Sequence, residues 1–345
     1  MKQASKRGKT AVVMAWREGE DDLQATIEDS VRSAGKSAIV FPVEDKTGAG
    51  PAQTRHRGIV AAKEAGCDVV CIVDAHMRFD GNVLQLMARQ VRRDGKGLLC
   101  AMCHHNAACS FVAAHPSGAG YYAGAEIHYK GEDQNGQQAL VWKWSEDGKP
   151  GPRACVGGAC YVFPVAWYFD VGQPLAALPA WGCDEEALSI SAWLSGVQPT
   201  VFNGHVAHQW RPRPPWKSAA NPLKQSRAAL ILATVTDKAE IDDLSAWQGC
   251  KPTASPAVAR WRAALLKQPR TFAQWKATVP VMPEVKLRVP RANYSANETK
   301  RLCRQCGCPD SSVTNTRRTG RVVLRYRTCA DCGARRVTRD ICATV

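Results

Sequence analysis

No apolar run in the sequence reaches the roughly 18 residues that a helix needs to cross a bilayer. A secretory signal is also lacking, because the basic amino terminus leads into only a short apolar stretch, 11–16, before Arg17 and Glu18. We find no internal repeat. We therefore expect a soluble, cytoplasmic chain without a membrane partner.

Acidic residues are also in short supply. Asp and Glu number 31 against 46 Lys and Arg, which gives a formal net charge of +15. Residues 300–345 contain eleven Lys and Arg, three Asp and no Glu, so a net charge of +8 lies in this tail. A surplus of this size favours a polyanionic partner, and we expect the tail to contact the phosphate groups of nucleic acid.

Cysteine, in contrast, is plentiful at 15 residues, but an odd number in a long chain without a secretory signal argues against a disulfide framework. Two Cys-x-x-Cys pairs lie in the basic tail, Cys303 with Cys306 and Cys329 with Cys332. Four thiolates form the tetrahedral set that Zn²⁺ favours in structural sites. A strand pattern at 321–328 lies between the pairs, so the tail resembles a zinc ribbon, a small β fold common in proteins that handle nucleic acid.

Strand-like and helix-like patterns alternate in the first part of the chain. Apolar runs at 10–16, 37–43 and 68–73 are separated by helical patterns at 21–34 and 54–65. Strands that alternate with helices predict the α/β class, with a parallel sheet that carries helices on its faces.

Composition divides the chain into four segments. We expect an α/β domain at 1–222, in which 115–158 forms loops and hairpins. A helical extension at 223–279 follows, then a Pro-rich linker at 280–299 and the small β zinc ribbon at 300–345.

A carboxylate and an imidazole follow the third apolar run. Asp74 and His76 project to the same side, because side chains on an extended segment repeat every two residues. They lie at the carboxyl end of a strand, where open α/β sheets bind ligands. The two residues could share a divalent cation, although for Asp-x-His alone a core or surface histidine is the better interpretation.

Four motifs follow one another between residues 53 and 211. They are Gln53-Thr54-Arg55-His56-Arg57-Gly58 with Asp74-Ala75-His76, then Gly157-Gly158, then Trp181-Gly182-Cys183-Asp184-Glu185-Glu186-Ala187-Leu188-Ser189, and finally Ala207-His208-Gln209-Trp210-Arg211. In order and spacing these motifs resemble the metal-dependent GT-A nucleotide-sugar glycosyltransferases, most closely the branch of the polypeptide N-acetylgalactosaminyltransferases. The resemblance covers about residues 9–215.

The resemblance implies a Rossmann-like GT-A fold and a sugar transfer assisted by a metal ion. Asp74, His76 and His208 would hold Mn²⁺ or Mg²⁺ against the two phosphates of a nucleotide-sugar co-substrate such as a UDP-sugar.

The resemblance also implies further contacts to the nucleotide. Arg55 and Arg211 would add charge-assisted contacts to the phosphates. Arg211 is also a candidate catalytic residue. The segment 209–217 around it would be a lid over the sugar nucleotide or a wall of the acceptor site. Glu44 and Asp45 follow the second strand, where this family binds uridine and ribose, although a solvated strand end would look the same.

Asp184 and Glu185 are the candidate catalytic acids. They match the acidic pair of family-two-like glycosyltransferases, in which such an acid can be the base. Asp184 and Ala187 stand where the family has Glu, so its sugar and acceptor pocket is not carried over.

A sugar-transfer domain joined to a basic ribbon suggests that the ribbon holds the acceptor. A 5-hydroxymethyl group on a pyrimidine offers a primary alcohol in the major groove of DNA. The leading hypothesis is therefore a DNA glycosyltransferase acting on 5-hydroxymethylcytosine or 5-hydroxymethyluracil, of the kind that bacteriophages use in the host cytoplasm. Two alternatives stay open: transfer to protein or polysaccharide, and a nucleic-acid-binding protein with an inert transferase domain. The sequence does not indicate the sugar, the stereochemical outcome or the oligomeric state.

Overall fold

The computed structural model describes two compact units, which lie within residues 1–282 and 283–345. The described residues are 8–20, 22–106, 109, 111, 122–133, 136–145, 148–179, 182–209, 220–251, 253–279, 311–319, 322–329 and 335–341.

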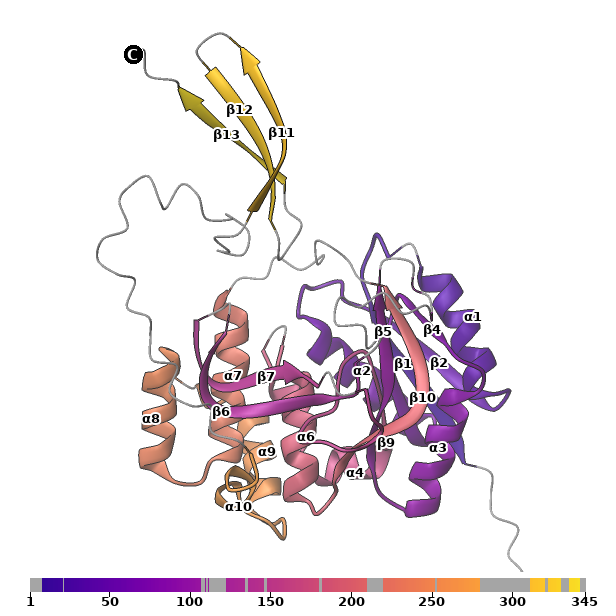
Figure 1. The fold of residues 1–345 in the computed structure, drawn as a ribbon. Coiled ribbons are helices and arrows are strands. Elements are labelled where there is room, and N and C mark those ends of the chain that lie inside the picture. Colours follow the sequence, from indigo (N-terminus) through magenta and orange to yellow (C-terminus); the bar gives the residue numbers. More distant parts are fainter. Residues whose placement is uncertain are drawn as a thin grey trace, which may run out of the picture. The chain divides into compact units, whose positions relative to one another are not determined.

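The first unit is built on one mixed sheet with the strand order β2-β1-β3-β9-β5-β10-β4, and β8 pairs with β10 (Figure 1). The strands are β1 (Lys9–Trp16), β2 (Ala38–Glu44), β3 (Cys67–Asp74), β4 (Met77–Phe79), β5 (Leu98–Asn106), β8 (Gly151–Pro152), β9 (Cys160–Pro164) and β10 (Pro199–Gln209). Strand β1 runs parallel to β2 and β3, and β5 runs parallel to β10.

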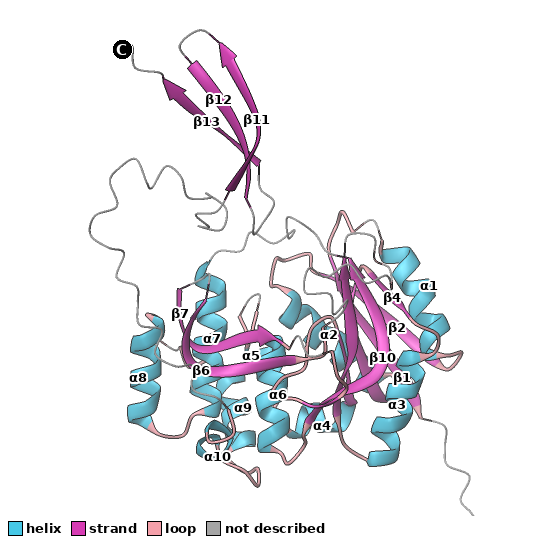
Figure 2. Ribbon diagram, viewed as in Figure 1, coloured by secondary structure: helices cyan, strands magenta, loops and turns pink. Residues whose placement is uncertain are grey.

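Helices cover both faces of this sheet, as Figure 2 shows. They are α1 (Leu23–Ala34), α2 (Pro51–Glu64), α3 (Val83–Asp94), α4 (Val165–Asp170), α5 (Pro174–Ala177) and α6 (Asp184–Leu194). Alternate side chains of β1 enter different cores: Ala11 and Val13 pack on the side of α2, and Val12 and Met14 on the side of α3. Both faces are apolar, as expected of central strands between two helical layers.

The sequence predicted the elements of the amino-terminal part and the parallel pairing of its strands, since β1 runs parallel to β2 and β3. The apolar runs are confirmed as β1, β2 and β3, and the helical patterns as α1 and α2. The prediction of a parallel sheet holds only in part, because β9 runs antiparallel to both β3 and β5. Parallel neighbours need a crossover connection. Here the chain passes from β5 to β9 through the antiparallel hairpin of β6 (Ala125–Asp133) and β7 (Gly136–Trp144).

The helices after residue 220 share the core of the first unit. They are α7 (Ala220–Thr234), α8 (Lys238–Gln248), α9 (Pro256–Leu265) and α10 (Phe272–Lys276). Trp261 of α9 is fully buried, and its indole N–H donates to Ser191 Oγ of α6 at 3.0 Å. The carboxyl-terminal helices therefore support α6, which carries the candidate acids.

The second unit contains a three-stranded antiparallel sheet in the order β11-β12-β13. The strands are β11 (Ser311–Thr319), β12 (Val322–Cys329) and β13 (Arg335–Ile341). The strand predicted at 321–328 is β12, shifted by one residue. Cys303, Cys306 and Cys332 lie outside the described residues, as does the side chain of Cys329, so the zinc site stays a prediction.

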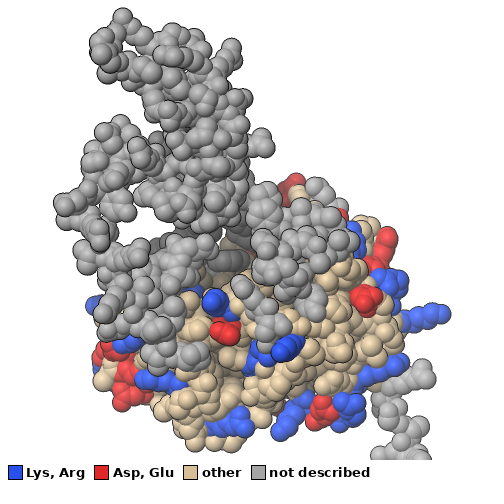
Figure 3. All heavy atoms as spheres, in the orientation of Figure 1, with Lys and Arg blue, Asp and Glu red and all other residues tan. Residues whose placement is uncertain are grey.

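Two surface properties bear on the partner. Among the described residues, no helix is both long enough and apolar enough to span a membrane. On the face that Figure 3 displays, Lys and Arg of the first unit are interspersed with Asp and Glu.

The contact of α2 with β1 predicts the effect of a single methyl group. A Cβ atom at Gly58 would lie 2.3 Å from Val13 Cγ1. Ala is the better helix former by about 1 kcal/mol, but overpacking of a core costs about 1–3 kcal/mol. We expect Gly58→Ala to lower the free energy of unfolding, measured by urea denaturation, and to do so less in a Val13→Ala background. A higher free energy of unfolding for Gly58→Ala than for wild type would contradict the close contact between Gly58 and Val13.

Candidate functional site

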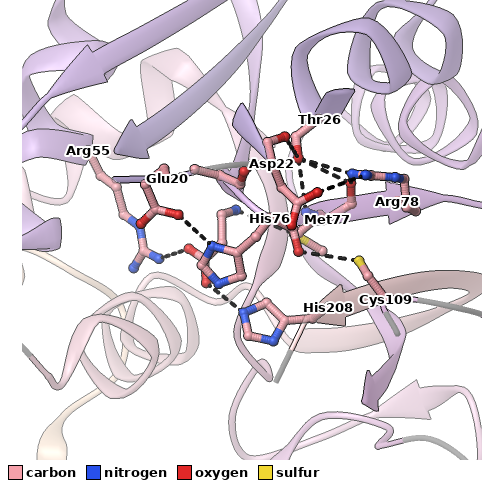
Figure 4. A network of polar contacts seen from close by, with 11 residues as sticks. Glu20, Asp22, Thr26, Arg55, His76, Met77, Arg78, Cys109 and His208 are labelled. Atoms are coloured by element: carbon pink, nitrogen blue, oxygen red, sulfur yellow. Dashed lines mark hydrogen bonds and ion pairs between the residues drawn. The ribbon is translucent and has the colours of Figure 1, made fainter. Parts of the chain in front are cut away.

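Asp74, His76 and His208 converge at the carboxyl edge of the sheet. One ligand atom from each residue lies within 4.8 Å of the other two. The imidazole rings of His76 and His208 lie side by side (Figure 4); their centroids are 4.6 Å apart and their planes are tilted by 56°. Among the described residues, these three form the only group of His, Cys, Asp or Glu side chains that lie close enough together to hold a metal ion.

Strand pairing sets the position of His208. It lies opposite Met77 in the antiparallel pairing of β10 with β4, and the backbone N–H of Gln209 donates to the carbonyl oxygen of His76 at 3.0 Å. The short strand β4 begins directly after His76. The register of β10 on β4 therefore brings together two ligands that lie far apart in the sequence.

Asp74 is held as a carboxylate by its neighbours. Arg55 of α2 donates to Asp74 Oδ1, and His208 Nε2 lies 3.3 Å from Asp74 Oδ2. Burial alone would raise the pKa of Asp74, but the Arg55 guanidinium, followed by His208 and His76, lowers it well below its usual range. An ionised oxygen donor beside two imidazoles is a set that fits a divalent cation.

Glu20 orients His76, and the sequence analysis did not identify it. Its Oε2 atom lies 3.2 Å from His76 Nδ1 (Figure 4). A carboxylate on Nδ1 fixes the tautomer that presents the lone pair of Nε2, as is common for histidine ligands of metals. Glu20 follows the carboxyl end of β1, at the same sheet edge as Asp74, and this position was the available signal.

The first turn of α6 brings three acids to the same cavity. Asp184 Oδ2 accepts a hydrogen bond from Arg55 Nη1 at 2.7 Å, and Glu185 Oε1 accepts one from the Tyr161 hydroxyl at 3.0 Å. Asp184 and Glu186 are buried, whereas Glu185 is half-buried. The helix amino terminus favours negative charge at all three positions.

The acids of α6 bind protons more tightly than free carboxyl groups. Desolvation, then the charges of Asp184 and Glu186, raise the pKa of Glu185 to about 8. Burial also raises the pKa of Asp184 and of Glu186, against the opposing effects of Arg55 and Arg227. A carboxyl group that titrates near neutral pH suits general acid–base chemistry.

A cavity of about 680 Å³ joins the metal ligands to the acids. Its wall includes Asp74, His76 and His208 on one part, Asp184 and Glu185 on another, and Trp142 and Trp144 of β7. This volume lies in the range of small-molecule sites. A Cβ atom at Gly158 would lie 2.5 Å from Glu185 Oε1, so glycine at this position leaves room for the carboxyl group.

Other predicted residues lie elsewhere or have other partners. Asp45 is buried, accepts hydrogen bonds from the N–H groups of Ala49 and Gly50, and pairs with Arg17 at 3.1 Å. Its neighbour Glu44 lies 3.4 Å from Lys46 Nζ. Neither acid is among the residues of the cavity wall, and their role in binding the nucleotide stays a prediction.

The two arginines predicted to contact phosphate have different outcomes. Arg55 lines the cavity, but its guanidinium is bound between Asp74 and Asp184. Arg211 lies outside the described residues, so its role stays a prediction.

No protein-family model and no curated protein matches the chain. The solved structures similar to it include the following three. GalNAc-T7 with UDP, GalNAc and Mn²⁺ is 14% identical over 71% of this chain, with a TM-score of 0.48. The catalytic domain of Drosophila β1,4-galactosyltransferase 7 with xylobiose is 14% identical over 64% of this chain and 80% of its own, with a TM-score of 0.40. S. aureus TarS 1–349 with UDP-GlcNAc is 12% identical over 68% of this chain and 70% of its own, with a TM-score of 0.42. The chain spans 55% of the GalNAc-T7 chain.

The raised pKa of Glu185 predicts a pH-dependent change in stability. The folded protein keeps a proton up to about pH 8 that the unfolded chain releases near its ordinary value of 4.5. The contribution of this carboxyl group to stability therefore falls as the pH rises through that interval. Gln cannot ionise, so we expect the free energy of unfolding of Glu185→Gln, relative to wild type, to increase between pH 5 and pH 8 in urea titrations. The matched control is Glu64→Gln, because Glu64 is exposed. If the difference in the free energy of unfolding between Glu185→Gln and wild type stayed constant from pH 5 to pH 8, the raised pKa of Glu185 would be contradicted.

Proposed function

We propose that this chain is a metal-dependent glycosyltransferase that moves a sugar from a nucleotide diphosphate-sugar, such as a UDP-sugar, to a hydroxyl acceptor. The observation that carries the proposal is the convergence of Asp74, His76 and His208 on a cavity that also holds the acids of α6. A cation site and a titratable acid in one cavity are what such a transfer requires: charge for the leaving diphosphate and a proton acceptor for the nucleophile.

The donor set favours Mn²⁺ over Mg²⁺. Mg²⁺ prefers six oxygen donors in regular octahedral geometry, whereas this site offers two imidazole nitrogens and one carboxylate. When bound, the ion supplies positive charge that stabilises the departing diphosphate. Arg55 keeps Asp74 ionised and Glu20 orients His76, so both ligands are prepared for a cation.

Glu185 is the best placed proton acceptor for the incoming hydroxyl. Of the three acids in the first turn of α6 it is the one that is partly exposed, and it lines the cavity. Tyr161 donates to Glu185 Oε1 at 3.0 Å, which orients the carboxyl group and leaves its second oxygen for the acceptor hydroxyl. Asp184 positions Arg55 instead, since the guanidinium binds its Oδ2 atom.

DNA that carries a 5-hydroxymethylpyrimidine is the proposed acceptor. The support is electrostatic: residues 300–345 carry a net charge of +8, and such a surplus binds phosphate groups without reading sequence. A ribbon folded around Zn²⁺ by Cys303, Cys306, Cys329 and Cys332 would present this charge on a rigid support. The hydroxymethyl group then supplies the primary alcohol that the unmodified base lacks.

An assay of sugar transfer tests the proposal. The protein is incubated with Mn²⁺, a panel of UDP-sugars and duplex DNA containing 5-hydroxymethylcytosine, 5-hydroxymethyluracil or neither, and the digested nucleosides are weighed by mass spectrometry. We expect a hexose-type mass increase only on a hydroxymethylated base and only with the divalent ion. Asp74→Ala and Glu185→Gln should each lower the rate by roughly 10²-fold or more, whereas Asp170→Asn, exposed on α4, should keep it.

The outcomes separate the two parts of the proposal. Transfer to protein or polysaccharide but not to DNA would overturn the acceptor and keep the transferase. Neither binding nor hydrolysis of any nucleotide-sugar in the presence of Mn²⁺ would contradict the transferase itself.

A further inference from the structure

Arg227 of α7 is a buried cation in the cavity wall that neither the metal site nor the catalytic acids use. Its side chain is 5% exposed, and its Nη2 atom lies 4.0 Å from Glu186 Oε1. Its Nε and Nη1 atoms are buried and have no hydrogen-bond partner among the described residues.

The burial of the Arg227 guanidinium without hydrogen-bond partners is energetically costly. Arginine stays protonated at any relevant pH, so the charge cannot be relieved by loss of a proton. A buried N–H group without a hydrogen-bond partner destabilises the fold, and more so when the group is charged. Glu186 compensates only in part, because 4.0 Å is beyond hydrogen-bond distance.

A second unpartnered donor lines the same cavity. The indole Nε1 atom of Trp142 on β7 is buried and also has no hydrogen-bond partner among the described residues. Guanidinium and indole groups donate hydrogen bonds and accept none. A group that satisfies either donor must therefore carry acceptor atoms, and the planar fork of arginine matches the oxygens of a carboxylate or a phosphate.

We propose that Arg227 and Trp142 form an anion subsite for a carboxylate or phosphate group of a substrate, distinct from the metal ligands that hold the diphosphate. Two sources offer this chemistry: the carboxylate of a transferred uronic acid and a phosphate group of the acceptor. The choice between these sources rests on the proposed function, whereas the subsite itself rests on the buried donors.

Calorimetric titration distinguishes the sources. In the presence of Mn²⁺, wild-type full-length protein is titrated with UDP-glucuronic acid and with UDP-glucose, which differ by one carboxylate. With UDP present, it is titrated with a dinucleoside monophosphate that contains 5-hydroxymethyldeoxycytidine and with the free nucleoside. We expect the anionic member of one pair to bind at least tenfold more tightly, as expected for a charged hydrogen bond. The pair that shows the difference identifies the source.

Variants assign the difference to the subsite. Arg227→Gln should bring the affinity ratio of that pair close to one, and Trp142→Phe, which keeps the ring and loses the N–H, should reduce it several-fold. Arg260→Gln, an exposed charge on α9, is the matched control and should keep the wild-type ratio. Thermal melting monitors the fold of each variant, and Trp142→Phe remains informative if Arg227→Gln does not fold.

The subsite is refuted if wild-type protein prefers the anionic member of neither pair, or if folded Arg227→Gln keeps the preference. Free glucuronate against glucose, titrated without nucleotide, gives the same comparison should UDP not bind. If UDP does not bind, the proposed function is contradicted, and the titration of glucuronate against glucose still tests the anion subsite.

Discussion

The site depends on Arg55, which binds two carboxylates from different parts of the fold. Its guanidinium donates to Asp74 at the end of β3 and to Asp184 at the start of α6. It also donates to the Tyr161 hydroxyl, which in turn donates to Glu185. Removal of one partner from a buried ion pair leaves an uncompensated charge and typically costs 3–5 kcal/mol. One side chain thereby fixes the cation ligand and the candidate base relative to each other.

In this structure Arg55 binds carboxylates, and the phosphate contact that the resemblance implied stays a prediction. Both of its terminal nitrogens are used by carboxylates, and its side chain is buried. The cavity wall has five carboxyl groups, Glu20, Asp74, Asp184, Glu185 and Glu186, against the cations Arg55, Lys143 and Arg227. Such a wall favours a divalent cation, and a bound cation would in turn make the cavity receptive to a diphosphate. The anion subsite at Arg227 gives the substrate a second point of attachment.

Only part of the metal site could be predicted from local sequence patterns. Asp74 and His76 follow from the two-residue period of a strand that ends at an open sheet edge. His208 followed only from the resemblance, since nothing local in β10 states that it pairs with the short strand β4 beside His76. Local sequence also did not indicate that the oxygens of Asp45 accept hydrogen bonds from the backbone of its own loop, and its predicted contact with the nucleotide stays a prediction.

Residues that depend on tertiary packing were missed. Glu20, Arg227 and Trp142 lie on a loop, a helix and a hairpin strand that have no common sequence signal, and only the fold brings them to one cavity. The antiparallel direction of β9 was missed for the same reason: a five-residue apolar strand reads the same in either direction.

The central claim is that Asp74, His76 and His208 hold a divalent cation against a nucleotide diphosphate. Pulsed electron paramagnetic resonance of Mn²⁺ bound to the protein in the presence of UDP tests it directly. The account predicts couplings to two imidazole nitrogens and to phosphorus, with one nitrogen coupling lost in His76→Ala and the other in His208→Ala. Spectra of fully hydrated Mn²⁺, or bound Mn²⁺ without nitrogen and phosphorus couplings, would contradict it.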